Sequence, residues 1–542
     1  MQKHLEPRRY LVSFDTHHLP HLFTDVLVVG SGVAGLRAAM EAARMGSVLL
    51  VTKSSLADSN SDEAQGGVAA VMSPEDDLEA HASDTLRLGQ GLADEQVVRM
   101  VVSEGPAEVR HLIDWGAQFD RSDGELSLTK EGGHSHARIV HARGDATGAE
   151  LVRSLTAVVA QAPLIQVLEH TFVIDLLTTD NNCVGAFAWD DRRGLTLIWA
   201  HACILATGGG GQVYRETTNP EVATGDGIAL AYRAGAELRD LEFVQFHPTT
   251  LYIAGAARTL ISETVRGEGG LLRNRRGERF MPRYHPDAEL APRDVVTRAI
   301  LKEMQATGDT HVYLDLTHLA AQPMRERFPK IAQVCANFDI DITRDLIPVR
   351  PSAHYFVGGV TTDTEGRTNL EGLYAAGEVA STGLHGANRL GSNSLLEALV
   401  LGRRTGEAAG AWARHRRPRA QVPLHLRSAL EAPRKDQIDL RDVANSLKSV
   451  MWRRVGIERD EASLGEAEER IDFWTSYVLA TEFLSPVGWQ LQNMLTVAKL
   501  ITHCARERLE SRGVHLRTDY PETDDVQWRR HITVQKRVPT LV

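Results

Sequence analysis

Cysteine is scarce in this sequence of 542 residues, and its few thiols lie far apart. There is no CxxC pair and no spacing typical of metal ligands among the four cysteines, which are Cys183, Cys203, Cys335 and Cys504. This pattern argues against zinc or iron–sulfur ligation and suits a reducing compartment. We therefore expect buried, inert thiols and no bound metal.

A surplus of positive charge is also absent. The chain has 60 lysines and arginines against 71 aspartates and glutamates, which gives a formal net charge of -11. No global positive field exists to hold nucleic acid or anionic lipid. Any anion that the protein binds must be met by a local cluster of cations.

Long apolar runs are missing as well. No stretch of roughly 18 apolar residues occurs, and the nearest candidate, residues 151–168, is interrupted by Arg153 and Pro163. The first 24 residues contain an Arg-Arg pair, but the polar "DTHHLPH" follows where an export signal has its apolar segment. We expect no transmembrane helix, a short N-terminal extension and a cytoplasmic protein.

The composition and the strand pattern indicate a large α/β protein. Hydrophobic residues make up 43% and charged residues 24% of the chain, and its length predicts two or three domains. The run "DVLVVGSGVAGLRAAMEAARMGSVLLVTK", residues 25–53, predicts a strand, a glycine-rich turn, a helix and a second strand. Later aliphatic runs at 202–211 and 372–380 end in small residues, as strands do where a ligand approaches the carboxyl edge of a sheet.

The segments between and after these strands predict the domain division. A polar, Arg- and Pro-rich stretch cannot extend a parallel sheet and is interpreted as an inserted lobe beside a cleft. A basic run at 414–434 is interpreted as a solvated linker, and apolar residues at helical spacing beyond it predict a helical bundle. We expect a dinucleotide-binding domain at 25–246 and 351–420, an inserted domain at 247–350 and a helical domain at 425–542.

A dinucleotide fingerprint lies between the first strand and its helix. Gly30, Gly32 and Gly35 form a GxGxxG motif there, so the first amides of the helix are placed to hold a pyrophosphate. The alternative is that the glycines serve only a tight turn. The second strand ends in Thr52 and Lys53, where an NAD-binding protein carries an acidic ribose ligand, and this opposes a plain NAD dehydrogenase.

Further motifs occur in a fixed order: AQGGVAAV, EGGHS, ATGGGG, FHPT, RGEGG, APRD, GLYAAGE and GANRLGSNSLLEALVLGRR. With GSGVAGL before them, they resemble the flavoprotein superfamily of succinate dehydrogenase and fumarate reductase, from residue 25 to about 404. "VMWRRVGI" and "ESRGVHLRTDYPE" resemble its C-terminal part. The resemblance implies an α/β fold, with a Rossmann-like FAD-binding domain, an inserted α+β capping domain and a C-terminal helical bundle.

The same resemblance implies FAD and the residues that hold it. Residues 31–34 correspond to the pyrophosphate site, Lys53 to the adenosine site, and the helix N-terminus at Ser394 to the flavin, where a helix dipole stabilises negative charge. The implied set is Gly30, Ser31, Gly32, Val33, Ala34, Gly35, Lys53, Asn60, Ser61, Asp62, Glu63, Ala64, Gln65, Gly66, Gly67, Asp226, Glu378, Ser394 and Leu395.

Glu378 has a second possible role, and Asn60 differs from the residue found in respiratory members. For Glu378 the alternative is a solvated loop carboxylate. Respiratory members have a histidine covalently bonded to FAD where this chain has Asn60, and asparagine cannot form that bond. Non-covalent FAD is therefore expected.

A dicarboxylate site is implied by His247, Arg293, His354 and Arg389, each in a separate motif. Two carboxylates need forked or histidine donors at both ends, and arginine supplies a bidentate geometry that lysine lacks. By resemblance, His354 and Arg389 hold the carboxylate next to the reacting carbon, and His247 and Ser262 hold the distal one. Taken singly, each histidine is more often a core residue.

The family's proton donor for fumarate reduction corresponds to Arg293. A guanidinium pKa above about 12 suits an acid poorly, so an electrostatic role is the alternative, with Glu263 and Arg266 relaying protons.

The carboxylate of Glu131 precedes the GGHS sequence, where respiratory members usually have an aromatic residue. An unpaired buried carboxylate costs several kcal/mol, and the ammonium of an amino-dicarboxylate offers it a partner. The alternative is an ion pair with a neighbouring Arg or His. We predict oxidation of L-aspartate to iminoaspartate, with FAD reoxidised by oxygen or fumarate. By resemblance, iminoaspartate then feeds quinolinate synthase in de novo NAD biosynthesis.

Two other functions are weighed against this one. A soluble fumarate reductase or respiratory flavoprotein subunit would need iron–sulfur or haem partners, and Asn60 and Glu131 oppose it. A flavin-binding protein for RNA modification or scaffolding is opposed by the acidic net charge.

Overall fold

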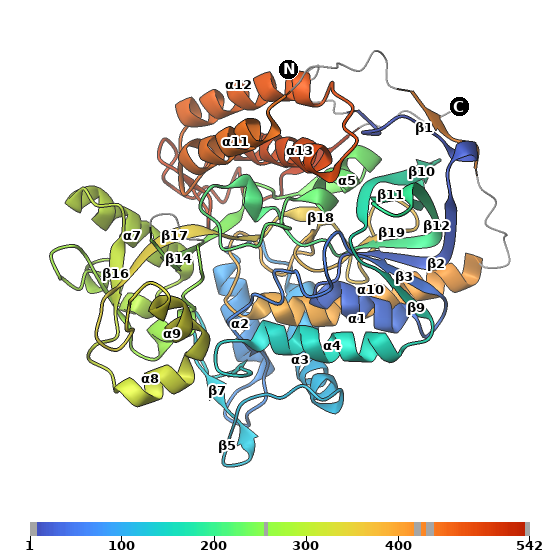
Figure 1. The fold of residues 1–542 in the computed structure, drawn as a ribbon. Coiled ribbons are helices and arrows are strands. Elements are labelled where there is room, and N and C mark those ends of the chain that lie inside the picture. The colour runs from blue at the N-terminus through green and yellow to red at the C-terminus, as the bar shows by residue number, and fades with distance from the viewer. Residues whose placement is uncertain (1–7, 254–257, 417–423, 430–437, 537–542) are drawn as a thin grey trace.

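The computed structural model describes residues 8–253, 258–416, 424–429 and 438–536. Figure 1 shows a twisted sheet with helices beneath it, a smaller lobe on the left, and a group of C-terminal helices above. The predicted fold class, α/β with an inserted lobe and C-terminal helices, is confirmed. The exact domain boundaries given above stay predictions.

The sheet of the dinucleotide-binding domain has seven strands in the order β10-β11-β12-β2-β3-β9, with β19 pairing β12 from outside this path. The pairs that involve β2, β3, β9 and β19 are parallel, and their aliphatic side chains are buried, which explains the continuous apolar runs. Because β19 comes late in the chain, the domain is discontinuous in sequence. The strands are β2 (His21–Val29), β3 (Val48–Val51), β9 (Ile165–Leu168), β10 (Phe172–Thr179), β11 (Asn182–Asp190), β12 (Gly194–Leu205) and β19 (Leu373–Ala375).

Helices α1 (Val33–Ala42), α4 (Thr147–Gln161) and α10 (Asn393–Arg416) cover one face of this sheet (Figure 1). Helix α10 packs closely on α1, because a Cβ atom at Gly406 would lie 2.3 Å from the carbonyl oxygen of Ala38. Gly402 packs in the same way on Ala34, so the middle of α10 lies beside the first turn of α1.

The inserted lobe, called the cap below, is built on a four-stranded antiparallel sheet in the order β14-β17-β16-β15. It has an apolar core of its own, which includes Val296, Ile300, Leu314, Phe328 and Ile331. Its elements are β14 (Val244–Leu251), α6 (Glu263–Gly267), β15 (Leu271–Arg273), α7 (Arg293–Thr307), β16 (Val312–Asp315), α8 (Ala321–Arg327), α9 (Pro329–Ala336) and β17 (Ile347–Phe356).

The C-terminal helices are α11 (Leu440–Arg454), α12 (Glu461–Val478) and α13 (Pro486–Glu507). The residues predicted to form their apolar stripes are buried: Val443, Leu447, Val450, Leu491, Met494, Leu495, Ala498 and Ile501. They do not form a separate core, because they share one cluster with sheet residues such as Leu27 and Leu205. Helix α5 (Asp226–Ala234) lies between the two layers and contributes to the same cluster.

The N-terminal extension is docked onto the large sheet. Tyr10, Leu11, Val12 and Phe14 are buried against residues of β10, β11 and β12. Strand β1 (Phe14–Asp15) pairs with β21 (Arg427–Ser428), which lies within the predicted linker. Residues 417–423 and 430–434 of that linker lie outside the described residues.

The described residues bear on two features predicted for the whole chain, its membrane spans and its thiols. None of the helices there is long and apolar enough to cross a membrane. The four cysteines are buried free thiols, as the scattered spacing predicted.

Candidate active site

A cavity of about 450 Å³ lies where the dinucleotide-binding domain meets the cap. Most residues expected at the cofactor and substrate sites line it. The expected residues that do not line it are Gly35, Asp62, Glu131 and Arg266. Gly35 instead packs under the turn, since a Cβ there would lie 2.0 Å from the carbonyl oxygen of Gly30.

The glycine-rich turn lines the cavity and packs closely on the segment that follows β12. Gly30 has a φ of +110, and a Cβ atom at this position would lie 2.2 Å from the carbonyl oxygen of Ala206. Helix α1 starts directly after the turn with no capping side chain of its own, and the Val33 amide donates to Ser61 Oγ at 3.1 Å. The first turn of α1 is therefore open to an anion.

Lys53 and Asp226 are bonded to one another at the cavity wall. Lys53 Nζ donates to Asp226 Oδ2 at 2.5 Å and to Thr224 Oγ1 at 2.7 Å. Asn493 Nδ2 donates to the other oxygen of Asp226, which links this part of the cavity to α13. Both residues line the cavity, so their contacts with each other leave room for a further polar partner.

Around the middle of the cavity, buried polar atoms lack partners among the described residues. Asn60 Oδ1, Gln65 Oε1 and Thr207 Oγ1 are buried without a hydrogen bond. A buried polar group without a partner costs free energy, so these atoms indicate a polar ligand. These unpaired polar atoms, with the glycine turn beside them, fit a bound dinucleotide such as FAD.

Glu378 is fixed rather than solvated. Its carboxylate accepts from Asn60 Nδ2 at 2.9 Å and from the Phe356 amide at 3.0 Å. Burial raises the pKa of Glu378 above its usual range. The alternative of a solvated loop carboxylate is therefore wrong.

His247 and His354 lie on the neighbouring strands β14 and β17, with their ring centroids 5.1 Å apart. Burial lowers the pKa of both rings well below the usual value, and Arg293 adds to each shift. Both are therefore neutral at physiological pH. His247 Nδ1 lies 3.1 Å from the Thr249 carbonyl oxygen and 3.2 Å from the Thr249 amide, so this backbone contact holds the ring in either tautomer.

The two arginines share an amide oxygen that the sequence reasoning missed. Arg293 Nη1 and Arg389 Nη1 each donate to Gln245 Oε1, both at 3.2 Å. Gln245 precedes His247 by two positions on the same strand, so side chains with period two share a face. That period was the signal that could have identified it.

Arg389 has no carboxylate within ion-pair distance among the described residues. Its guanidinium lies 4.7 Å from the ring of Tyr355 and donates to Ser394 Oγ at 2.7 Å, while Nε has no partner. Burial lowers the pKa of Arg389 to about 10, and Arg293 contributes to the shift. This buried, incompletely paired cation is suited to bind an anion.

Behind Arg293, two further charges form a chain into the cap. Arg293 Nε donates to Glu263 Oε2 at 2.6 Å, and Glu263 Oε1 lies 3.4 Å from Arg266 Nη2. Although burial opposes it, Arg293 and Arg266 hold the pKa of Glu263 below its usual range. Ser262 caps the short helix α6 that carries Glu263 and Arg266, and its hydroxyl lies at the cavity wall.

Glu131 is 2% exposed and accepts from two hydroxyls, Ser392 Oγ at 2.7 Å and Thr264 Oγ1 at 3.1 Å. Within the described part of the chain, no Arg or His lies within ion-pair distance of Glu131. A Cβ atom at Gly391 would lie 3.0 Å from Glu131 Oε2, 3.1 Å from Arg293 Nη2 and 3.3 Å from Glu263 Oε2. Glu131 therefore reaches the edge of the substrate region even though it does not line the cavity itself.

Burial and the nearby Glu263 raise the pKa of Glu131 above its usual range. This carboxyl group is therefore easier to protonate than an exposed glutamate. Ser392 and Thr264, which position it, were not predicted, because a hydroxyl in a loop has no distinctive sequence pattern.

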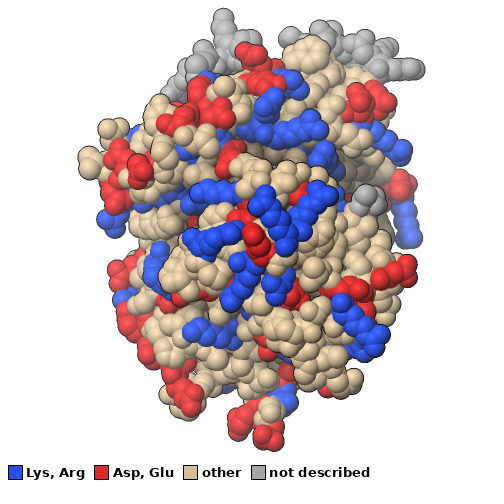
Figure 2. All heavy atoms as spheres, turned by 90° about the vertical axis from the view of Figure 1, so that its left-hand side faces the viewer, with Lys and Arg blue, Asp and Glu red and all other residues tan. Residues whose placement is uncertain are grey.

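Cations also gather around the cavity. Figure 2 shows lysine and arginine side chains across the middle of the face that carries the cap. Arg258 lines the cavity and lies 4.5 Å from the ring of Tyr252, while Arg350 lies 5.3 Å from the rings of both Tyr252 and Trp452. In a chain of net charge -11, these cations provide a local positive region next to the cavity.

Comparisons with known proteins agree with this arrangement. A family model described as FAD binding domain matches residues 25–395, and one described as fumarate reductase flavoprotein C-term matches residues 444–541. The L-aspartate oxidase of Streptomyces coelicolor is 45% identical, covering 94% of this chain and 91% of its own. The chloroplastic L-aspartate oxidase 2-a of Nicotiana tabacum is 43% identical, covering 96% of this chain and 84% of its own. A solved quinol fumarate reductase chain from E. coli is 32% identical with a TM-score of 0.87, covering 97% of this chain and 99% of that chain.

Proposed function

The chain belongs to the FAD-binding flavoprotein family that includes fumarate reductase and L-aspartate oxidase, and we propose that it oxidises L-aspartate to iminoaspartate. The observation that carries this choice is the placement of Glu131. It is a buried carboxyl group at the edge of a cluster of cations, with only hydroxyl partners among the described residues. An amino-dicarboxylate matches both features, because it has two carboxylates for the cations and an ammonium for Glu131.

The two carboxylates of the substrate are divided between two groups of residues. Arg389 and His354 bind the carboxylate next to the reacting carbon, and His247 and Ser262 bind the distal one. The neutral His247 ring offers Nε2 as a hydrogen-bonding atom, while the unpaired Nε of Arg389 offers a charged donor. Together they hold the substrate in one orientation. Holding the reacting groups in a productive geometry supplies a large part of an enzyme's rate enhancement.

Glu131 is proposed to recognise the amino group. On binding, the ammonium offsets the burial that raises the carboxyl pKa, favours the ionised form of Glu131 and pairs with it. Ser392 and Thr264 keep the carboxylate oriented for this contact. A substrate without an amino group offers Glu131 no cation and gains nothing from it.

FAD, when bound, supplies the acceptor for the hydride that leaves Cα of L-aspartate. The residues proposed to hold it are the glycine turn, the loop from Asn60 to Gly67, Glu378 and the first turn of α10 at Ser394 and Leu395. The N-terminal end of α10 favours negative charge near the isoalloxazine ring. Arg293, held by Glu263, adds positive charge beside the reacting carbon and is linked through Glu263 to Arg266 for proton transfer.

The wider role follows from this reaction. Either oxygen or fumarate takes the electrons back from the reduced cofactor, and the product iminoaspartate feeds quinolinate synthase in de novo NAD biosynthesis. The reduced, scattered cysteines fit a cytoplasmic location, although the tobacco relative is described as chloroplastic.

FAD is proposed to bind without a covalent bond. Asn60 donates to Glu378 and has no nucleophilic ring nitrogen with which to attach a flavin. Acid precipitation of the purified holoenzyme should leave the flavin in the supernatant. Flavin fluorescence that stays with the protein band on a denaturing gel would contradict this.

An oxygen-electrode assay across four-carbon acids and amino acids tests the proposed function. L-Aspartate should consume oxygen and release hydrogen peroxide, and succinate should not. Fumarate reductase is the second candidate, supported by the 32% identity and the TM-score of 0.87 to the E. coli chain. Oxidation of succinate without oxidation of L-aspartate would favour it.

A further inference from the structure

The cap contacts the dinucleotide-binding domain at a second place, away from the substrate cavity. There Asp145, in the loop before α4, accepts two backbone hydrogen bonds from the cap. Its Oδ1 accepts from the Lys330 amide at 3.1 Å, and its Oδ2 accepts from the Ile331 amide at 2.8 Å. Asp145 is only 1% exposed, so these bonds are shielded from water.

These two amides are the first free N–H groups of α9. The helix starts at Pro329, which has no N–H, and Phe328 before it offers no capping side chain. The first amides of a helix normally donate to a side chain of the residue directly before it. Here they donate instead to a carboxylate of the other domain, 185 positions earlier in sequence.

Neighbouring contacts join the same two surfaces. Arg327 Nη1 donates to the Gly144 carbonyl at 2.9 Å. Gly144 has a φ of +72, and a Cβ atom there would lie 2.6 Å from the carbonyl oxygen of Arg327. Lys330 Nζ lies 3.2 Å from Glu63, which belongs to the loop proposed to surround the flavin. The junction is therefore close-packed and polar, and it reaches the cofactor loop.

Helix α9 shares an apolar core with the part of the cap that carries Arg293. Phe328, Ile331 and Cys335 are buried in the same apolar core as Val296 and Ile300 of α7. Helix α7 begins at Arg293, in the substrate cavity. Since packed cores transmit displacement, the position of α9 against Asp145 sets the position of Arg293 over the cofactor site.

We propose that Asp145 is a positioning residue that holds the cap closed over the substrate cavity by capping α9 from the opposite domain. Because the substrate must enter and leave, the cap must open, and we take the open and closed arrangements of the ligand-free protein to be comparable in free energy. Weakening the contact then lowers the closed fraction directly, and the apparent affinity for substrate falls by that fraction.

The test is steady-state kinetics of the holoenzyme carrying Asp145→Ala. We expect KM for L-aspartate to rise about 10-fold while kcat stays within about twofold, because saturating substrate closes the cap again. Arg327→Met, which leaves Asp145 intact and removes the neighbouring interdomain bond, should raise KM about threefold. The second variant keeps the proposal testable if the first does not fold.

Asp439→Ala is the matched control. Asp439 also caps a helix with two amides, those of Arg441 at 3.1 Å and Asp442 at 3.0 Å, but the helix is its own, α11. These two bonds are exposed, so losing them should lower the denaturation midpoint less than Asp145→Ala does, and it should leave KM unchanged. An equal rise of KM in the control, or a fall of kcat with unchanged KM in Asp145→Ala, would overturn the proposal.

The kinetic readout rests on the proposed function, so hydrogen exchange of the holoenzyme provides a readout without turnover. In Asp145→Ala the amides of residues 330 and 331 should exchange at least about tenfold faster, and succinate should restore part of the protection. Unchanged exchange in the variant contradicts the closing role. Faster exchange in a protein that does not oxidise L-aspartate would support the contact and reject only the proposed substrate.

Discussion

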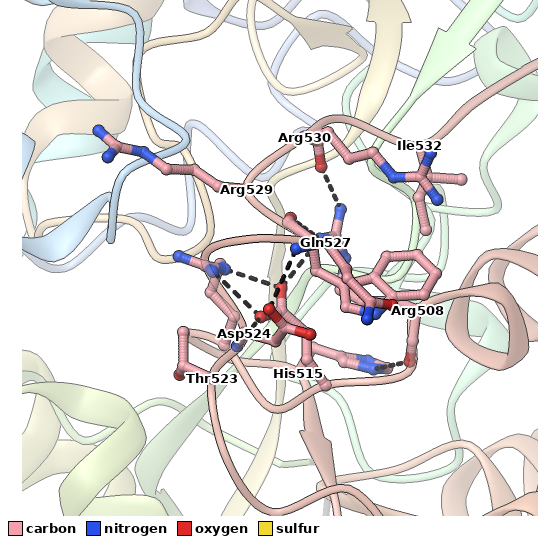
Figure 3. A network of polar contacts seen from close by, with 12 residues as sticks. Arg508, His515, Thr523, Asp524, Gln527, Arg529, Arg530 and Ile532 are labelled. Atoms are coloured by element: carbon pink, nitrogen blue, oxygen red, sulfur yellow. Dashed lines mark hydrogen bonds and ion pairs between the residues drawn. The ribbon is translucent and has the colours of Figure 1, made fainter.

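Two clusters of buried arginine in this molecule are partnered in opposite ways. One lies in the C-terminal segment that follows α13, and Figure 3 shows part of it. The other surrounds the substrate cavity. Their difference separates charge that stabilises the fold from charge that is kept for a ligand.

In the C-terminal cluster each guanidinium has acidic partners. Arg508 lies 2.6 Å from Glu242 and 3.1 Å from Glu510, and it also donates to the carbonyl oxygens of Trp528 and Arg530, both at 2.9 Å. Arg512 makes a forked contact with Glu510, at 2.7 and 3.0 Å. Although burial opposes it, these carboxylates hold the pKa of both arginines above the usual value.

At the substrate cavity the arginines have fewer carboxylate partners. Arg293 and Arg266 share Glu263, and Arg389 has no carboxylate partner among the described residues. Burial raises the pKa of Glu131 and lowers the pKa of Arg389 and of Arg266. We expect a bound dicarboxylate to supply the partners that these arginines lack.

Replacing Arg389 tests the cluster at the substrate cavity and should have the largest effect. Arg389→Met should lower kcat/KM for L-aspartate by about 10⁴-fold, because it removes the charged donor to one carboxylate in a desolvated site. The free energy of unfolding without ligand should stay the same or rise by up to about 2 kcal/mol, since an incompletely paired buried cation is lost. A strongly destabilised but active variant would contradict the contrast between the two clusters.

Replacing Arg508 tests the C-terminal cluster. Arg508→Met leaves Glu242 and Glu510 without their main partner and should cost about 3–5 kcal/mol of unfolding free energy. Denaturation midpoints of the holoenzyme measure it. Arg99→Met, which removes an exposed pair with Glu79 and Glu95, is the control and should cost no more than about 1 kcal/mol. Equal losses of unfolding free energy in both variants would mean that burial of the C-terminal network adds nothing to the stability of the fold.

The smallest effect concerns Asp519 at the edge of the same network. Arg517 holds the pKa of Asp519 at about 2, and the side chain is 30% exposed. Because this pKa lies below that of the unfolded chain, the stabilisation is present at neutral pH and is lost as the pH falls towards about 2. Asp519→Asn should therefore cost about 1 kcal/mol or less at pH 7 and almost nothing near pH 2. A difference that grows on acidification would contradict this assignment.

The sheet and the identity of the site residues could be predicted because their signals are local. Buried parallel strands are continuous aliphatic runs, and the glycine turn has a fixed spacing. His247, Arg293, His354 and Arg389 were identified from four separate motifs, and the structure brings all four to one cavity. The roles given to them stay predictions.

Other features depend on contacts between distant residues and left no local pattern. Gln245 is central only because two arginines from elsewhere converge on it. The merging of the C-terminal helices with the core of the sheet arises from packing that spacing alone does not encode. The same holds for Asp145, whose role depends on a helix 185 positions away.

The most direct test of the account compares two reactions of one variant, Glu131→Gln. Glutamine keeps an acceptor for Ser392 and Thr264 but cannot pair with an ammonium. We expect kcat/KM for L-aspartate oxidation to fall at least about 30-fold, the cost of losing one partner of a buried charge pair, and fumarate reduction to change by less than about threefold. Equal losses with both substrates would contradict the claim that this carboxyl group is reserved for the amino group.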